Sequence, residues 1–403
     1  MPCPRFALVA LTLTLAFAVG HRANAETDLG VSDRDIEPFQ IKLLDLAYES
    51  ASTFPINPHI KNRSRAQLAV VDAALHLGQP SLAARYAEGI ANWRRGQAYA
   101  RLALYHLEHG GNDEDAKQFM QEAERVAKVP GLASWRYDRI MGPVGRCYQL
   151  LEQAEEADRV AATVDDTTQA QLIVQKDGGG DQDFENDLAV VRGLIKNEDY
   201  DRSSVAVNLL IDMYADHFCE SEKRKKIVEL IRRAYRDFPP VHRLNTLYKL
   251  AQVSIEQRDI AEASDFIDEA ETYQDRFRWP LQQYVPMLVR LAELRHQAGD
   301  PARASETLER AVTTFHEHKS ELYTYQHAAV IRDIAAGFAK TGKLERAHSL
   351  YGEAVDAGSI NPNVRPRTED IVHTAVSMAL SGVEPDADLF SAMQGILKDL
   401  SER

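Results

Sequence analysis

The chain has 403 residues, of which 44% are hydrophobic and 27% are charged. These fractions are ordinary for a globular protein and exclude a disordered or collagen-like chain. Asp and Glu outnumber Lys and Arg by 61 to 47, which gives a net charge of −14. A surface this acidic repels phosphate, so we expect no nucleic-acid partner.

The first 25 residues have the pattern of a secretory signal peptide. Residues 6–20 form an almost unbroken apolar run, and Ala23 and Ala25 place small side chains just before a cleavage point at Glu26. The run is shorter than the roughly 20 apolar residues that span a bilayer, which favours cleavage over an uncleaved anchor. We therefore expect an exported protein, periplasmic or secreted, with no transmembrane span after cleavage.

Residues 26–62 are expected to form an N-terminal helical segment, and residues 63–164 a first block of helical repeats. From about Ile41 onward, apolar residues recur at helical spacing, with almost none of the alternation that predicts strands. Each unit consists of two amphipathic helices around a short turn. The residues that define the units of this block are Val70, Val71, Gly78 and Ala83; Leu102, Ala103, Gly110, Gly111, Ala116, Met120 and Ala123; and Met141, Val144, Gly145, Tyr148 and Ala157.

Residues 165–202 interrupt this rhythm and are expected to form an acidic, glycine-containing irregular connector. Asp177 and Asp181 flank three glycines, and further acids follow up to Asp187. The segment lacks the ligand order of an EF-hand loop. A solvated flexible loop is therefore favoured, and calcium binding at 177–187 is left open.

Residues 203–380 are expected to form a second block of repeats, and residues 381–403 a final helix. In one unit Asp300 and Pro301 predict a helix start, because an acid at the N-cap followed by proline suits the first turn. In the last unit Gly342 suits the left-handed position that ends a helix. The final helix has a single apolar face, which is typical of a helix that caps the end of a solenoid.

The units resemble the tetratricopeptide repeat (TPR), whose first helix follows W-x₂-L-G-x₂-Y and whose second follows A-x₃-F-x₂-A. The best matches to the two patterns are Val144, Gly145 and Tyr148, and Ala347, Tyr351 and Ala354. No unit has the tryptophan of the pattern, so the repeats are divergent. The resemblance implies that the following residues pack the helices of the repeats together: Gly145, Tyr148, Ala251, Ala263, Ala292, Ala304, Ala335, Phe338, Ala347, Tyr351 and Ala354.

This resemblance implies an all-α fold, in which αα-hairpins form a right-handed solenoid wound as a TPR-like superhelix. The C-terminal capping helix would close one end of it. A generic right-handed helical solenoid is the alternative.

Candidate catalytic and metal-binding motifs are weak. A near match to the phosphate-binding loop has Leu344 where the motif needs a hydroxyl group, and no strand precedes it. His316 and His318 lie about 200° apart around a helix, so they cannot share one metal ion. His106 and His109 share a face, but no third ligand is evident. We predict no catalytic residues, no metal site and no cofactor.

Partner binding is better supported by the sequence. In the TPR family the first helix of each repeat lines a concave groove, and basic residues in that groove would attract an acidic or C-terminal peptide segment. In the alternative reading, Arg290 pairs with Glu293 and Arg332 neighbours Asp333, as on an ordinary mixed-charge helix face. The groove residues that the resemblance implies are Arg101, Asn245, Tyr248, Lys249, Gln252, Arg290, Glu293, His296, Gln297, Arg332 and Lys340.

The sequence therefore predicts a scaffold that binds a protein or peptide in the groove of a solenoid, and not an enzyme. The alternative is an exported all-helical enzyme, for example a sugar-active helical toroid with an acidic catalytic cleft. The two differ in form. A toroid brings its first and last hairpins into contact and places two carboxylates in one pocket, whereas a scaffold is an open superhelix.

Overall fold

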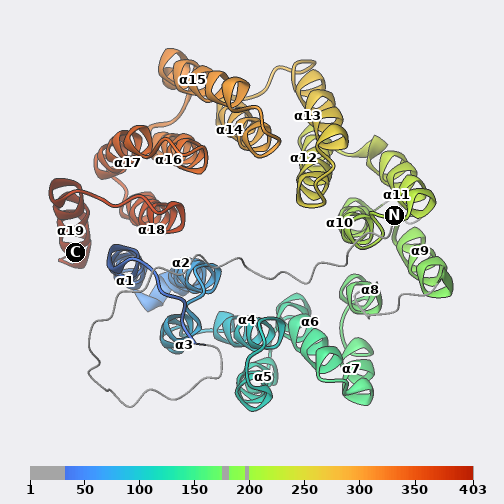
Figure 1. Ribbon diagram of the computed structural model, residues 1–403. Helices are drawn as coiled ribbons and strands as arrows, with labels where there is room; N and C mark the ends of the chain where they lie inside the picture. Colours follow the sequence, from blue (N-terminus) through green and yellow to red (C-terminus); the bar gives the residue numbers. More distant parts are fainter. Residues whose placement is uncertain (1–31, 175–180, 196–198, 403) are drawn as a thin grey trace.

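The computed structural model describes residues 32–174, 181–195 and 199–402 (Figure 1). The regular elements in these ranges are all helices, so the predicted all-α fold is confirmed. The predicted signal peptide and the cleavage point between Ala25 and Glu26 lie outside the described residues. Within the described residues, no helix is both long enough and apolar enough to cross a membrane.

The α-helices follow one another with short turns between them. Their bounds are α1 Pro38–Ser52, α2 Ile56–His76, α3 Pro80–Glu88, α4 Arg94–Glu108, α5 Asp113–Ala127, α6 Ser134–Leu150, α7 Ala154–Ala161, α8 Asp166–Val174, α9 Asp181–Ile195, α10 Tyr200–Asp216, α11 Ser221–Ala234, α12 Pro240–Glu256, α13 Ile260–Gln274, α14 Leu281–Gln297, α15 Pro301–His318, α16 Thr324–Lys340, α17 Leu344–Ser359, α18 Val364–Ser381 and α19 Ala387–Ser401.

Successive helices pair as hairpins, for example α4 with α5 and α16 with α17. The turn between α16 and α17 contains Gly342 at φ 79°, the left-handed conformation that glycine enters without a Cβ clash. Arg258 occupies the equivalent turn between α12 and α13 at φ 63°. Asp300 caps α15, where its Oδ1 accepts a hydrogen bond from the Arg303 backbone N–H at 3.1 Å. The predicted hairpin turns and helix start are therefore confirmed.

The residues predicted to pack the helices together lie in the interior. All of them are buried except Tyr148, which is partly buried and donates a hydrogen bond from its hydroxyl to Glu124 Oε1 at 2.6 Å. A Cβ atom on Gly145 would lie 2.9 Å from Leu172 Cδ1, so a larger residue there would force the Leu172 side chain of α8 to shift.

The segment predicted as an irregular connector is largely helical, which corrects that prediction. Within 165–202 the structure places α8 and α9, and Phe184, Leu188 and Val191 of α9 are buried in the core. Because these residues are spaced by four and three positions, they form one apolar stripe on α9. This stripe stabilises a packed helix even though acidic residues lie between them. Residues 177–180 of the candidate calcium loop lie outside the described residues.

The hairpins close into a ring. The inner layer consists of the even-numbered helices from α2 to α18, and the outer layer consists of the odd-numbered helices from α3 to α19 (Figure 1). At the seam α18 contacts both α1 and α2, and Gln40 Nε2 of α1 donates a hydrogen bond to the Ala379 carbonyl of α18 at 2.7 Å. The array therefore closes on itself and does not end as an open superhelix.

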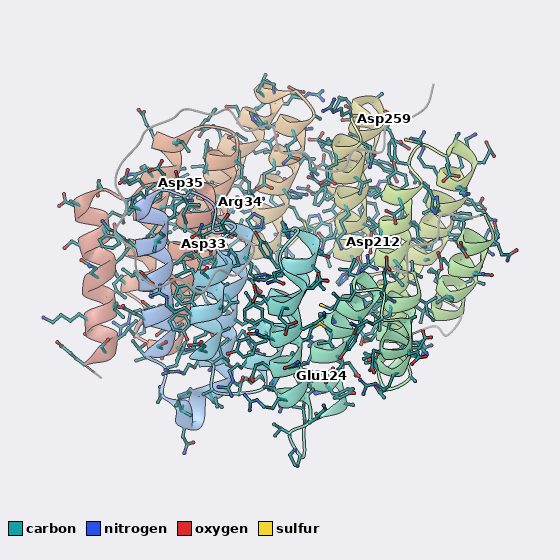
Figure 2. All side chains as sticks on the ribbon, turned by 60° about the horizontal axis from the view of Figure 1, so that its bottom comes forward. Asp33, Arg34, Asp35, Glu124, Asp212 and Asp259 are labelled. Atoms are coloured by element: carbon teal, nitrogen blue, oxygen red, sulfur yellow. The ribbon has the colours of Figure 1, made fainter. Side chains whose placement is uncertain are left out.

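Helix α1 closes the seam because it packs on both α2 and α18. Its residues Leu43, Leu44 and Ala47 are fully buried, and its main neighbour is α18. Helix α19 contacts α1, α17 and α18, so the predicted capping helix lies beside the seam and not at a free end. The segment before α1 is held on the α2–α3 turn, where the Ser81 backbone N–H donates to Asp33 Oδ1 at 3.0 Å (Figure 2).

Candidate functional site

Two pockets lie on the inner layer of the ring, both near the N-terminal ends of inner helices. The first, which we call the α12 pocket, has a volume of about 380 Å³. The second, the α16 pocket, has a volume of about 340 Å³. The α12 pocket is lined by Ser204, Val207, Asn208, Phe238, His242, Asn245, Thr246, Tyr248, Lys249 and Arg290. The α16 pocket is lined by Gln282, Pro286, Tyr325, Gln326, Ala329, Val330, Arg332, Asp333, Pro366, Glu369, Asp370 and His373.

The α12 pocket brings together four of the predicted groove residues, Asn245, Tyr248, Lys249 and Arg290. Asn245 and Lys249 are exposed and lie one helical turn apart on α12. Lys249 Nζ donates a hydrogen bond to Asn208 Oδ1 of α10 at 2.7 Å, which positions the ammonium group across the pocket. These two side chains offer hydrogen-bonding groups to a ligand.

Tyr248 contributes the wall of the α12 pocket and not a free polar group. It is buried, and its hydroxyl lies 3.1 Å from Gln274 Oε1 and 3.3 Å from the Met287 carbonyl. Burial raises the pKa of this phenol above its usual range. With Val207 and Phe238, both buried, it gives the pocket an apolar floor.

Arg290 belongs to an ion-pair network across α12, α14 and α16. Its Nη1 lies 2.9 Å from Glu293 Oε2, and its Nη2 donates to Gln252 Oε1 at 3.2 Å. Lys340 Nζ lies 2.9 Å from the other oxygen of the buried Glu293. The mixed-charge reading therefore describes this stretch, since Glu293 neutralises a basic group on each of two helices.

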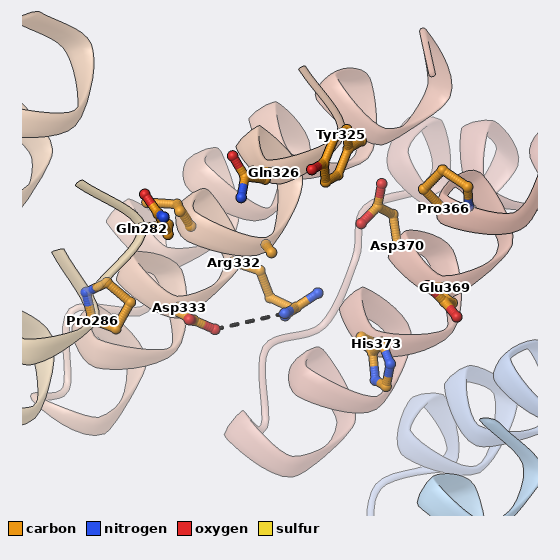
Figure 3. A pocket seen from close by; sticks show the side chains of 12 residues that line it. Gln282, Pro286, Tyr325, Gln326, Arg332, Asp333, Pro366, Glu369, Asp370 and His373 are labelled. Atoms are coloured by element: carbon orange, nitrogen blue, oxygen red, sulfur yellow. Dashed lines mark ion pairs between the residues drawn. The ribbon is translucent and has the colours of Figure 1, made fainter. Parts of the chain in front are cut away.

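The remaining predicted groove residues lie apart from the α12 pocket. Arg101 of α4 forms an ion pair with Asp72 of α2. His296 and Gln297 end α14 and line neither pocket. Arg332 lines the α16 pocket, where its Nη2 lies 3.7 Å from Asp333 Oδ1 (Figure 3).

The α16 pocket holds titratable groups that the sequence did not single out. Figure 3 shows the Arg332 guanidinium between Asp333 on one side and Asp370 and His373 on the other. Asp370 is 8% exposed, and its Oδ2 has no hydrogen-bond partner among the described residues. Asp370 and His373 lie one turn apart on α18. This helix has no strong repeat pattern, so no sequence motif pointed to them.

Burial governs the protonation of these groups. It raises the pKa of Asp370 to about 7, because the Arg332 charge compensates only part of the desolvation. Burial also raises the pKa of Asp333 and lowers that of His373 to about 4. Near neutral pH, the Asp370 carboxyl group is therefore partly protonated, while His373 is a neutral imidazole. Within the ranges that the structure describes, no three His, Cys, Asp or Glu side chains are grouped to hold a metal ion.

No protein-family model and no curated protein matches this chain. Among solved structures, it is similar to a Rap protein complexed with Competence and Sporulation Factor, with 12% identity and a TM-score of 0.30 over 77% of this chain and 98% of that one. It is also similar to a circular tandem repeat protein with novel repeat topology, with 17% identity and a TM-score of 0.27 over 90% of this chain and 94% of that one.

Proposed function

We propose that the protein is an exported scaffold that binds a peptide, or a segment of another protein, at the α12 pocket on the inner layer of the ring. The observation that supports this proposal is the meeting of Asn245, Lys249 and Arg290 around one pocket, since these residues come from two different hairpins. In this proposal the protein performs no reaction and needs no cofactor.

The chemistry of the pocket suits a peptide. A peptide presents backbone C=O and N–H groups beside apolar side chains, and binding sites of this kind combine an apolar wall with a few polar groups. The pocket has both, since Val207 and Phe238 lie beside the amide of Asn245 and the ammonium of Lys249. The nearby N-terminal end of α12 adds a partial positive charge, which favours a carboxylate or carbonyl group of the ligand.

Capture of a partner by the immobilised mature protein tests the proposal. The variant Asn245→Ala/Lys249→Glu removes one exposed polar group from the pocket and reverses the charge of another, so it should lose most of the bound partner. Lys225→Glu is the matched control, because Lys225 is 71% exposed and belongs to the outer helix α11. A photo-crosslinking residue at position 245 should label the same partner. Equal capture by both variants would place binding elsewhere.

Export is part of the proposal and has a test of its own. N-terminal sequencing of the protein from its native cells should recover Glu26 as the first residue, in a fraction outside the cytoplasm. Recovery of Met1 in a membrane fraction would contradict it.

The closed ring supports a second candidate, a sugar-active helical enzyme. The seam between α1 and α18 brings the first and last parts of the array together, and Asp333 and Asp370 line one pocket. A carboxyl group that is protonated near neutral pH is suited to act as a general acid. Release of reducing ends from oligosaccharides, lost in Asp370→Asn, would establish this candidate over the scaffold.

A further inference from the structure

A cluster of arginines and tryptophans lies on the inner helices α2, α4 and α6. Helices α4 and α6 lie across the ring from α14 (Figure 1). The cluster lies apart from both pockets. Arg65 comes from α2, Trp93 and Arg94 from the start of α4, and the rest from the start of α6. We call it the Arg–Trp patch, and its members are Arg65, Arg94, Arg136, Arg139, Trp93 and Trp135.

The two indole rings hold the guanidinium groups in place. Trp93 and Trp135 meet edge to face, with their centroids 5.3 Å apart. Arg94 lies 4.7 Å from the centre of the Trp93 ring, and Arg139 lies 5.3 Å from the centre of the Trp135 ring. Arg136 contacts both rings, at 5.7 and 5.1 Å. An arginine stacked on a ring face still has its N–H groups at the edge of the guanidinium, where they can pair with a carboxylate.

The described residues do not compensate the charges of the patch. None of the four arginines forms an ion pair with a carboxylate in the described part of the chain, although the whole chain is strongly acidic. Arg94 is only 8% exposed, and the single hydrogen bond of its side chain is a long one, 3.5 Å, to Ser64 Oγ. Arg136 Nε is buried and has no hydrogen-bond partner among the residues that the structure describes.

Two further observations point to an anionic ligand. Burial lowers the pKa of Arg94, and the charges of Arg65, Arg139 and Arg136 lower it further, so the patch is strained by its own repulsion. The α4 and α6 helices both begin at the patch, and helix N-termini add partial positive charge. An anion bound there would relieve both effects.

We infer that the Arg–Trp patch binds an acidic segment of a peptide partner, with Asp or Glu carboxylates on the arginine edges and an apolar side chain against Trp135. This inference rests on the proposed function, because it takes the occupant to be a peptide. Trp135 is 47% exposed beside the arginines. A free inorganic anion would make no apolar contact with this ring, whereas an apolar side chain of a peptide would. An acidic peptide with interspersed leucines fits both parts of the patch.

Tryptophan fluorescence provides a direct measurement, because the patch contains two of the three tryptophans of the chain. The mature protein is titrated with a tryptophan-free peptide of alternating Glu and Leu, with the matched Gln–Leu peptide, and with inorganic phosphate. The Glu–Leu peptide should change the emission at saturating concentration and bind at least about tenfold more tightly than the other two. Its affinity should fall about fivefold or more when salt is raised from about 50 to about 300 mM.

Two exposed arginines allow the patch to be altered without disturbing the core. Arg65→Gln/Arg139→Gln should lower the affinity for the Glu–Leu peptide about tenfold or more, because each variant side chain loses a charge-assisted hydrogen bond to a carboxylate of the peptide. Trp135→Ala should lower the affinity for the Glu–Leu peptide but leave the affinity for phosphate unchanged. Arg125→Gln is the control, because Arg125 lies on the outer helix α5 and pairs with Glu122.

Several outcomes would overturn the inference. Equal affinity for phosphate and the Glu–Leu peptide would make the patch a plain anion site, and wild-type affinity in the double arginine variant would place the peptide elsewhere. Loss of peptide binding in Asn245→Ala/Lys249→Glu, with the patch variants unaffected, would support the α12 pocket and reject the patch. The reverse result would keep the patch and reject the pocket.

Discussion

Two arcs of the same inner layer use basic residues in opposite ways. On α14 and α16, Arg290 and Lys340 share the buried carboxylate of Glu293. On α4 and α6, Arg94 and Arg136 stack on tryptophan rings and have no carboxylate partner among the described residues. The hairpins are alike in design, so the difference comes from single residues on the same or neighbouring helices. A basic residue on this layer keeps its charge unpaired only where no acid of the described residues lies within reach.

The largest loss of stability is expected when Glu293 is removed from the ion-pair network of α14 and α16. Glu293→Ala leaves Arg290 and Lys340 without their shared partner and should lower the free energy of unfolding by about 2 to 3 kcal/mol, as expected for hydrogen bonds to charged groups. Denaturation with urea measures the change. Glu309→Ala is the control, because Glu309 is 54% exposed and 3.8 Å from Arg346, and it should cost less than about 1 kcal/mol. Equal losses would mean that the network does not organise this arc.

Packing should be equally strict in the two arcs. Ala103 on α4 and Ala335 on α16 are both fully buried at the contact with the second helix of their hairpin. Ala103→Leu and Ala335→Leu should each destabilise the protein by about 1 to 3 kcal/mol through overpacking. An unchanged melting temperature for either variant would show that its hairpin is looser than the other.

Asp370 should make the paired side of the ring sensitive to pH. Because burial raises its pKa to about 7, the folded chain keeps a proton that the unfolded chain gives up above about pH 4. The wild type therefore loses stability from this group as pH rises through that range, whereas Asp370→Asn does not. Relative to wild type, the variant should gain about 2 to 3 kcal/mol between pH 4 and about pH 7.

Urea unfolding of both proteins at several pH values measures this gap, and the opposite contribution of His373 cancels because both proteins contain it. A gap that stays constant with pH would show that the Asp370 carboxyl titrates as an exposed group does.

The smallest change in stability is expected at the Arg–Trp patch on α4 and α6, where the variant should gain stability and not lose it. Arg139→Gln removes one of four mutually repelling charges from an exposed position, so it should raise the unfolding free energy by about 0.5 kcal/mol at low salt. The gain should disappear at high salt, where exposed charges are screened. A loss of stability would mean that the stacking of Arg139 on Trp135 outweighs the repulsion among the four arginines.

The sequence predicts the hairpins well because they depend on local patterns. The spacing of Ile331, Ala335 and Phe338, the turn at Gly342 and the cap at Asp300 are each set by residues within a few positions of one another. Closure of the ring does not follow from such patterns, because it depends on a small change of angle at every contact between hairpins. The apolar spacing of α9 was visible as well, but the surrounding acids and glycines obscured it.

The candidate site is less predictable, because it depends on contacts between helices. The register placed Asn245, Lys249 and Arg290 on the inner layer but did not show that Glu293 also faces Lys340, which lies 47 positions further along. Asp370 and His373 acquire their unusual pKa values from burial beside Arg332, on another helix. The arginines of the patch come from three helices, so no short motif contains them.

The seam also sets the order in which the chain can fold. Gln40 and Ala379 are hydrogen-bonded although 339 positions separate them, and contacts over such distances form slowly because a long loop must first be closed. The hairpins from α2 to α17 can assemble step by step as the chain emerges, and α1 can meet α2 and α3 early, but its most extensive contact must wait for α18. The seam is therefore the last part of the ring to form, and the ring is completed only when nearly the whole chain is present.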